Sequence, residues 1–379
     1  MALVIFGYPI AGALHSIVGG ASQTFSHPMR GITLLLALAV IFFGFRSSQF
    51  RMIDKLLAFF LAAYTLRLLY DWIIADIPGA DNALLYFYVL VVVPLLACAM
   101  KAPLITEERL QIALLVFGGI FVFLIISARN AGLAYNPWSD VGYELTRLGF
   151  EALNPISIGR AAGALAIVGV FMAANRDASR RWRAIGVTAF AVGLYVIILA
   201  NSRGPLAALI VTFCFVFISR PSHLLWGLAA VGAYFVVFGS ESILFTNVFE
   251  RFALAGAAED GASQIRFMIM NHAWAKFIEN PILGYHFIDP ILGEGLYPHN
   301  LILEAAMAHG IFGLVIFVAL IIRAFTIAML THRRRFPTLA ALFIYFFVAT
   351  NFSGALWGSQ EFFVTMAVCL ALAKRRAQV

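Results

Sequence analysis

Charged side chains are scarce in this 379-residue sequence, where Asp, Glu, Lys and Arg together make up only 12% of the residues. Hydrophobic residues, by contrast, make up 62%. A soluble domain does not have this balance, whereas a lipid bilayer demands repeated apolar segments of about 20 residues. The composition therefore excludes a soluble fold and predicts an all-α, polytopic membrane protein.

Cysteine is rare as well, and Cys98, Cys214 and Cys369 all lie within apolar segments. This distribution excludes a disulfide framework and a cysteine-based metal site. The sequence also lacks an Asp-x-Asp pair, a His-Glu-x-x-His motif, a P-loop and a glycine-rich dinucleotide fingerprint. We therefore expect no metal, no cofactor and no nucleotide-sugar site.

Long apolar segments recur along the whole chain. They are centred near residues 3–19, 31–45, 52–74, 83–100, 109–127, 156–174, 184–200, 205–219, 224–240, 300–330, 338–353 and 359–373. We interpret them as about twelve transmembrane helices that form a single membrane-embedded domain over residues 1–379.

Lys and Arg outnumber Asp and Glu, which gives a net charge of +7. In membrane proteins this excess gathers on cytoplasmic loops, so it does not indicate nucleic-acid binding. The basic clusters fall in alternate connections, and all of them are cytoplasmic if the N- and C-termini are cytoplasmic too. The other connections then face outward, including a large loop at residues 241–299.

The middle of this loop predicts a helix at the membrane interface. Residues 263–279 contain no Gly or Pro and mix apolar side chains with charged ones, as interfacial helices do. Pro281 and Gly284 end the helix. The loop itself ends at Pro298-His299-Asn300, directly before a new apolar segment.

Three arginines are expected near the outward face. Arg203 lies in a short break between two apolar segments, Arg266 begins the interfacial helix, and Arg160 follows the helix-start signal Asn154-Pro155. A guanidinium group stays charged and pairs with phosphate oxygens through two hydrogen bonds. Together the three could surround a diphosphate, whereas each alone could equally contact lipid headgroups.

His299 is the candidate general base, because histidine titrates near neutral pH. Asn300 and Glu304 follow on the first turns of the next helix and are candidate substrate-binding residues, together with Arg160. The alternative for His299 is a helix-capping residue. Arg67 and Asp71, four residues apart, are expected to pair inside the bundle, either as a structural contact or as part of an ion path.

Several motifs occur in a fixed order between residues 200 and 315. They are Ser202-Arg203-Gly204, then Arg266 with Trp274 and Asn280-Pro281-Ile282-Leu283-Gly284, then His299-Asn300 and Gly310-Ile311-Phe312-Gly313. In this order they resemble the O-antigen ligase and polysaccharide polymerase superfamily of bacterial inner-membrane glycan transferases. The N-terminal half resembles that superfamily in hydropathy only.

The resemblance implies a GT-C-like fold of about twelve helices, with a large periplasmic loop that contains interfacial helices. It also implies transfer of a glycan from undecaprenyl diphosphate to a hydroxyl acceptor, without metal or nucleotide. Arg203 and Arg266 would hold the donor diphosphate, and His299 would orient or deprotonate the acceptor hydroxyl, with inversion at the anomeric carbon. The implied partners are the lipid-linked oligosaccharide donor, the glycan acceptor and membrane lipids.

The motifs do not separate the branches of the superfamily. Polymerases join lipid-linked repeat units of O-antigen or exopolysaccharide, whereas ligases transfer the glycan to lipid A–core of lipopolysaccharide. The run from His299 to Glu304 resembles the polymerases slightly more. A lipid-linked glycan flippase is the alternative of another class, and the pair Arg67–Asp71 is the feature that favours it.

Overall fold

The computed structural model describes residues 1–19, 26–45, 52–134, 148–150, 153–217, 261–287, 297–332 and 335–376. Within these ranges every regular element is a helix, and β pairing is limited to one isolated bridge between Phe150 and Leu153. The expectation of an all-α protein is therefore confirmed for the described part of the chain.

The apolar segments of the sequence form the helices. These are α1 (Ala2–Val18), α2 (Ser26–Phe45), α3 (Lys55–Ile73), α4 (Ala80–Tyr86), α5 (Val93–Lys101), α6 (Glu107–Asn130), α7 (Pro155–Ala174), α8 (Arg180–Ala200), α9 (Arg203–Phe217), α12 (Gly261–Glu279), α13 (Leu301–Ile327), α14 (Pro337–Ser353) and α15 (Gln360–Arg376). A π-helical turn at Phe87–Val92 joins α4 to α5. Every expected segment overlaps a described helix except 224–240, which lies outside the described residues.

Several of these helices have the length and composition of membrane spans. In the described ranges, 6 helices are long and apolar enough to cross a bilayer, namely Lys55–Ile73, Ala80–Leu104, Glu107–Asn130, Pro155–Ala174, Arg180–Ala200 and Leu301–Leu330. Shorter apolar helices cover Ala2–Val18, His27–Phe43, Arg203–Phe215 and Pro337–Ser353. The chain is thus a helical membrane protein, and the count of about twelve spans stays a prediction.

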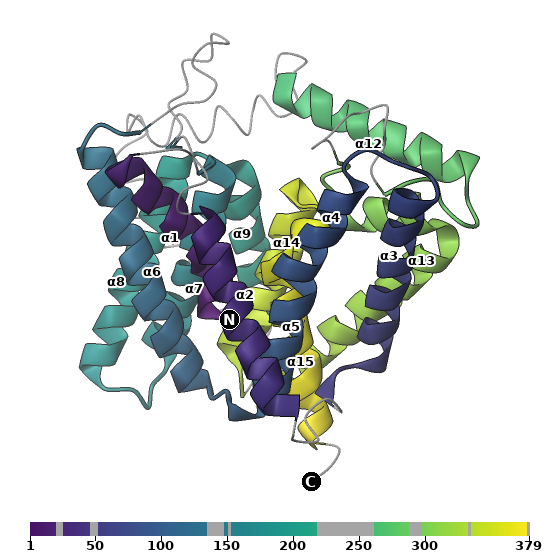
Figure 1. The fold of residues 1–379 in the computed structure, drawn as a ribbon. Coiled ribbons are helices and arrows are strands. Elements are labelled where there is room, and N and C mark those ends of the chain that lie inside the picture. Colours follow the sequence, from purple (N-terminus) through teal and green to yellow (C-terminus); the bar gives the residue numbers. More distant parts are fainter. Residues whose placement is uncertain are drawn as a thin grey trace.

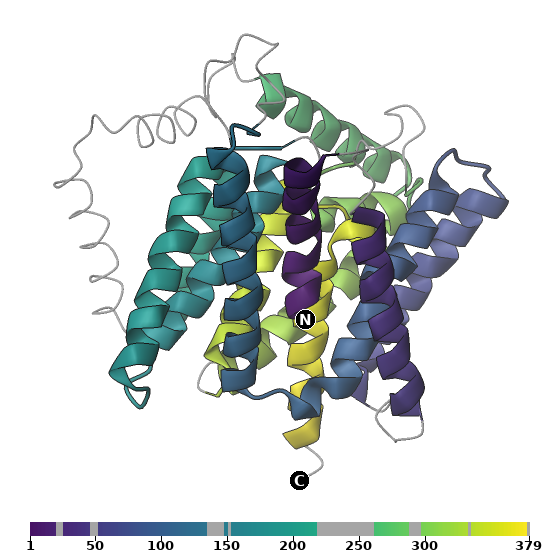
Figure 2. The same ribbon diagram turned by 60° about the vertical axis from the view of Figure 1, so that its left-hand side comes forward.

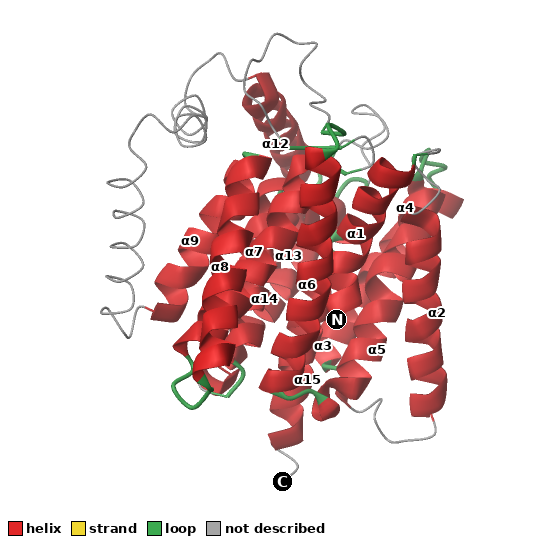
Figure 3. Ribbon diagram, turned by 90° about the vertical axis from the view of Figure 1, so that its left-hand side faces the viewer, coloured by secondary structure: helices red, strands yellow, loops and turns green. Residues whose placement is uncertain are grey.

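The helices run between two ends of one bundle, and α12 lies across one of these ends (Figures 1 and 2). We call it the α12 end. α6, α7, α8 and α9 form one side, α3 and α13 form the other, and α14 and α15 run between them (Figures 1 and 3). The C-terminal end of α15 lies at the opposite end, and the N-terminus lies about halfway along the bundle (Figure 1). The cytoplasmic location of both termini remains a prediction.

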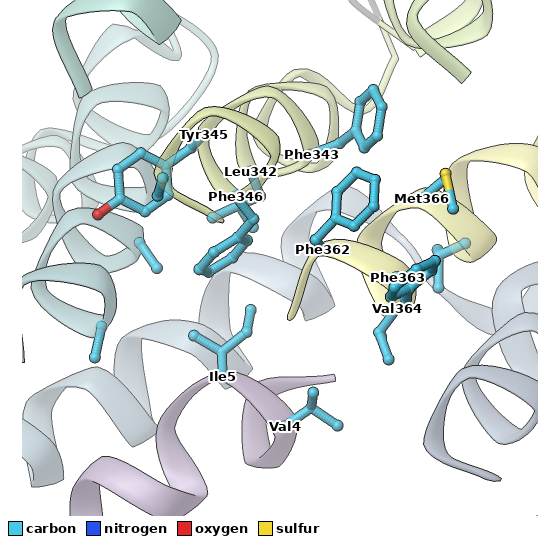
Figure 4. Packing of buried hydrophobic residues seen from close by; sticks show 14 of the residues in the cluster. Val4, Ile5, Leu342, Phe343, Tyr345, Phe346, Phe362, Phe363, Val364 and Met366 are labelled. Carbon is cyan, nitrogen blue, oxygen red and sulfur yellow. The ribbon is translucent and has the colours of Figure 1, made fainter. Parts of the chain in front are cut away.

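Aromatic residues fill the centre of the bundle. Phe343 of α14 stacks on Phe362 of α15 with a ring-centroid distance of 6.0 Å, and Phe362 packs against Phe363 at 5.0 Å (Figure 4). The buried Tyr345 hydroxyl donates a hydrogen bond of 3.1 Å to the carbonyl oxygen of Gly159, so its polar atom is satisfied. This packing fixes α14 against α7 and α15, and the end of α14 is where the candidate site begins.

Candidate functional site

The last turn of α14 joins the segments that carry the predicted site residues. The Asn351 side-chain oxygen accepts a hydrogen bond from the N–H of Leu301, the first residue of α13, at 3.2 Å. The Ser353 carbonyl oxygen accepts one from the Tyr297 hydroxyl at 3.5 Å, and the Ser353 hydroxyl lies 3.4 Å from a guanidinium nitrogen of Arg160. The starts of α7 and α13 therefore meet at one place, at the α12 end.

The start of α9 packs into the same place. A Cβ atom added at Gly204, the residue after Arg203, would lie only 3.1 Å from Cβ of Phe352 on α14. Gly159 of α7 is equally close to α9, because a Cβ there would lie 2.8 Å from the Pro205 ring. Arg203, which is half-buried, thus begins a helix beside the start of α7 and the end of α14.

Arg266 lies on α12, the helix that the sequence predicted over residues 263–279. Ile269, Ala273 and Phe277 form the buried face of this helix, which packs on α13. Arg266 precedes Ile269 by three residues and is half-buried on the same side of the helix. Its positive charge is one of the causes that lower the pKa of His299.

The chain after α12 is inserted into a break in α13. The break occurs at Gly310, with φ 64° and ψ −156°, inside an otherwise continuous helix. The freed N–H of Ile311 donates to the carbonyl oxygen of Pro281 at 2.8 Å, and Tyr285 N–H donates to the Met307 carbonyl oxygen at 2.7 Å. Two of the sequence motifs, residues 280–284 and 310–313, therefore bind each other and fix α12 relative to α13.

A buried carboxylate holds the same segment from the other side. Asp71 of α3 accepts hydrogen bonds from the N–H of Phe287 at 2.6 Å and pairs with His286 at 3.0 Å. Arg67 lies 3.1 Å from Asp71 and also donates to the Leu283 carbonyl oxygen at 3.3 Å. The expected pair between Arg67 and Asp71 exists, and its contacts anchor the chain between α12 and α13.

His299 occupies a strained turn immediately before α13. Its φ angle of 56° is in the left-handed region, which non-glycine residues seldom adopt outside functional or tightly constrained positions. Asn300 caps α13, because its side-chain oxygen accepts the N–H of Leu303 at 3.0 Å. The His299 ring lies 4.3 Å from the Tyr297 ring, and its Nδ1 atom is buried with no hydrogen-bond partner among the described residues.

The surroundings of His299 favour its neutral form. Burial, together with the positive charges of Arg266 and Arg160, lowers its pKa from 6.5 to about 4, and burial is the largest of these causes. Burial raises the pKa of the neighbouring Tyr297, so that hydroxyl keeps its proton. At neutral pH His299 therefore presents an imidazole lone pair that can accept a hydrogen bond or a proton.

Glu304 lies one turn further along α13 and is fully buried. One carboxylate oxygen accepts the N–H of Leu356 at 2.9 Å, and the other is buried without a partner in the described structure. The structure thus shows Glu304 holding the segment between α14 and α15, as it shows Asn300 capping α13. Direct contact of Glu304 and Asn300 with a substrate stays a prediction.

A cavity of about 240 Å³ opens beside Arg160 and Tyr297. Its other polar and aromatic lining residues come from α1, α2, the start of α7 and the stretch from the end of α14 to the start of α15. They are Tyr8, Arg30, Thr33, Asn154, Ser157, Ser353, Trp357, Ser359, Gln360 and Glu361. Sequence reasoning identified Arg160 but missed the others. The available signal was the cluster Trp357-Gly358-Ser359-Gln360-Glu361, which is polar and aromatic between two apolar helices.

Comparison with known families gives a match for this chain. Residues 188–318 match the family model described as O-antigen ligase. The matched segment contains Arg203, Arg266 and His299, together with the break at Gly310. No curated protein matches the chain. The match confirms the resemblance drawn from the motifs, and it supports a membrane glycosyltransferase of the ligase and polymerase type.

Proposed function

Because the chain carries an O-antigen ligase segment, we propose that it transfers a glycan from undecaprenyl diphosphate to a sugar hydroxyl. In this proposal the α12 end faces the periplasm, residues 241–299 form the large periplasmic loop, and the protein resides in the bacterial inner membrane with both termini cytoplasmic. The reaction uses no metal or other cofactor, because arginine side chains stabilise the leaving group. The observation that carries the proposal is that Arg160, Arg203 and His299 lie at the starts of three helices that meet at the end of α14.

Arg203 and Arg266 bind the donor diphosphate. Both are half-buried at the α12 end, where reduced water access strengthens their attraction to phosphate oxygens. Arg203 also begins α9, and the first-turn N–H groups and positive dipole end of that helix would face the same anion. These groups stabilise the negative charge that develops as the bond to the diphosphate breaks.

His299 binds and activates the acceptor hydroxyl. The hydroxyl oxygen attacks the anomeric carbon from the side opposite the diphosphate, and its proton passes to the neutral imidazole. The bond between the anomeric carbon and the diphosphate oxygen breaks, and the electron pair leaves with the diphosphate. The configuration is therefore inverted. A bound diphosphate offsets the nearby arginine charges, which raises the pKa of His299 and makes it a stronger base during the reaction.

The test is transfer activity of purified protein in nanodiscs, supplied with a lipid-linked oligosaccharide. His299→Ala removes the base, and we expect a loss of about 10²–10⁴-fold in rate. Arg203→Ala and Arg266→Ala should each cost about 10²-fold or more, the magnitude typical of a lost transition-state contact. Arg109→Ala is the matched control, because this exposed arginine lies at the opposite end of the bundle and should leave the rate unchanged. Near-normal transfer by folded variants of the three residues would refute these roles.

We propose repeat-unit polymerisation as the specific reaction, with ligation to lipid A–core as the alternative. A polymerase forms a ladder of products from the lipid-linked donor alone. A ligase forms one capped product, and only when lipid A–core is added. We do not propose transport, because Asp71 and Arg67 hold the chain after α12 through Phe287, His286 and Leu283.

A further inference from the structure

The cavity beside Arg160 lies next to the proposed reaction centre, and all of its lining residues except Tyr297 lie outside the matched segment. Tyr297 separates the two: its ring lies 4.3 Å from His299 and also forms part of the cavity wall. Arg203 and Arg266 are not among the residues that line the cavity. A molecule bound here would therefore lie beside Tyr297, one ring away from His299, and away from the groups proposed to hold the diphosphate.

Aromatic rings form much of the cavity wall. Trp357 lies 6.3 Å from Tyr297 and 6.0 Å from Tyr86, measured between ring centroids. Arg30 is held between two rings, with its guanidinium carbon 5.5 Å from the centroid of Tyr8 and 5.5 Å from that of Tyr86. Cation–π contacts of this kind fix an arginine in place and leave its N–H edge available to a ligand.

The remaining wall supplies hydrogen-bonding groups of both kinds. The Gln360 side-chain amide donates a hydrogen bond of 3.1 Å to the Val4 carbonyl oxygen. Its side-chain oxygen takes no part in that bond and can accept another. The Nε atom of Arg160 is buried without a hydrogen-bond partner among the described residues. Glu361 adds a carboxyl group to the same wall as Arg160. Donors, acceptors and flat apolar faces therefore surround one small space.

We propose that this cavity binds the terminal sugar of the acceptor; the inference rests on the proposed function. A sugar ring has apolar C–H faces that stack on aromatic rings and hydroxyls that need both donors and acceptors, which is what these walls offer. A volume of about 240 Å³ is below the ~300–1,000 Å³ of most ligand pockets, so it suits one sugar unit better than a whole oligosaccharide. The N-terminal half of the chain, with Tyr8, Arg30 and Asn154, then sets acceptor specificity.

The experiment measures binding of a free glycan, so that it does not depend on turnover. The probe is the repeat-unit oligosaccharide released by mild acid from the bacterium's own lipid-linked donor, which has neither diphosphate nor lipid. Saturation-transfer NMR on purified protein in nanodiscs gives its Kd. We expect Trp357→Leu and Glu361→Gln each to weaken binding at least tenfold. Trp182→Leu and Glu108→Gln are the matched controls, since both residues are exposed at the opposite end of the bundle.

The outcomes separate this inference from the proposed function. Glycan binding that is lost in the cavity variants and kept in Arg203→Ala supports the acceptor site, whatever the transfer activity of Arg203→Ala. Equal binding by wild type and Glu361→Gln, or no binding by wild type, would overturn the site even if transfer proceeds normally. Glu361→Gln is nearly isosteric and replaces one acceptor oxygen by an amide donor, so it decides the question if Trp357→Leu does not fold.

Discussion

The N–H of Ile311 donates a hydrogen bond of 2.8 Å to the carbonyl oxygen of Pro281 and so joins the chain that follows α12 to the break in α13. In a continuous helix that N–H would bond within α13. The break therefore exchanges one helical bond for a contact between two distant segments. Since α12 carries Arg266 and α13 follows His299, this contact sets the distance between the two predicted catalytic side chains.

Substitution of Gly310 by alanine should break this arrangement. Gly310 has φ 64° and ψ −156°, a region essentially restricted to glycine, and a Cβ atom there would overlap the Ile282 carbonyl oxygen. We expect Gly310→Ala to destabilise the protein by about 1–3 kcal/mol and to reduce transfer more than tenfold. Thermal unfolding in detergent and the nanodisc transfer assay measure both effects.

Gly119→Ala is the control for this prediction. Gly119 lies within α6, and a Cβ atom there would meet nothing within 4 Å. Alanine at an open helical position stabilises a helix by about 1 kcal/mol relative to glycine. A Gly310→Ala protein that unfolds and transfers like wild type would show that the break does not depend on the glycine.

Hydropathy and charge were sufficient to predict the helices, because a bilayer requires long apolar segments whatever their partners. They also predicted the helix at residues 263–279, which the structure places at Gly261–Glu279. The packing partner of that helix could not be predicted. Contacts such as the one between Ile311 and Pro281 join main-chain atoms, which every residue has, so residue type does not indicate them. Gly284 and Gly310 are the exceptions, because their positive φ angles favour glycine.

The site was predictable in part for a similar reason. Arginine and histidine in a polar break of an apolar chain are costly, so Arg203, Arg266 and His299 could be named as candidates from sequence, and their catalytic roles stay predictions. Trp357, Gln360 and Glu361 were missed because aromatic and polar residues at a helix start have ordinary structural explanations. They line a cavity because the fold brings them close to Arg30 and Arg160, which are distant in the sequence.

Asp71 should prove essential for holding the chain after α12. Its carboxylate receives the Phe287 N–H and lies close to both His286 and Arg67, all in a buried setting. Asp71→Asn removes the charge and replaces one acceptor oxygen by a donor, which leaves buried groups without partners. Breaking a buried pair in this way costs about 3–5 kcal/mol. We expect a lower unfolding temperature together with faster proteolysis near residues 280–287.

Asp81→Asn is the matched control, because Asp81 is exposed in the first turn of α4. It should change neither the unfolding temperature nor the proteolysis pattern. Substrate flux across vesicles that is lost in Asp71→Asn, with stability and cleavage unchanged, would contradict the anchoring role and favour an ion path through this residue.

The pH dependence of transfer should report the setting of His299. Burial, with the charges of Arg266 and Arg160, lowers its pKa from 6.5 to about 4, so the imidazole is neutral in the free enzyme over the pH range between these values. Because kcat/KM follows the free enzyme, it should hold steady as pH falls through 6.5 and decline only near pH 4. An ordinary histidine would instead produce the decline near 6.5.

Arg266→Gln provides the decisive comparison. Removal of this charge takes away one cause of the lowered pKa, while burial, the largest cause, remains. The acid limb of kcat/KM should therefore move to higher pH yet stop short of 6.5. Arg203→Gln also removes a positive charge from the proposed diphosphate site, and its lower activity should retain the wild-type acid limb. A limb that stays in place in Arg266→Gln, or moves equally in both variants, would mean that Arg266 and His299 do not act within one centre.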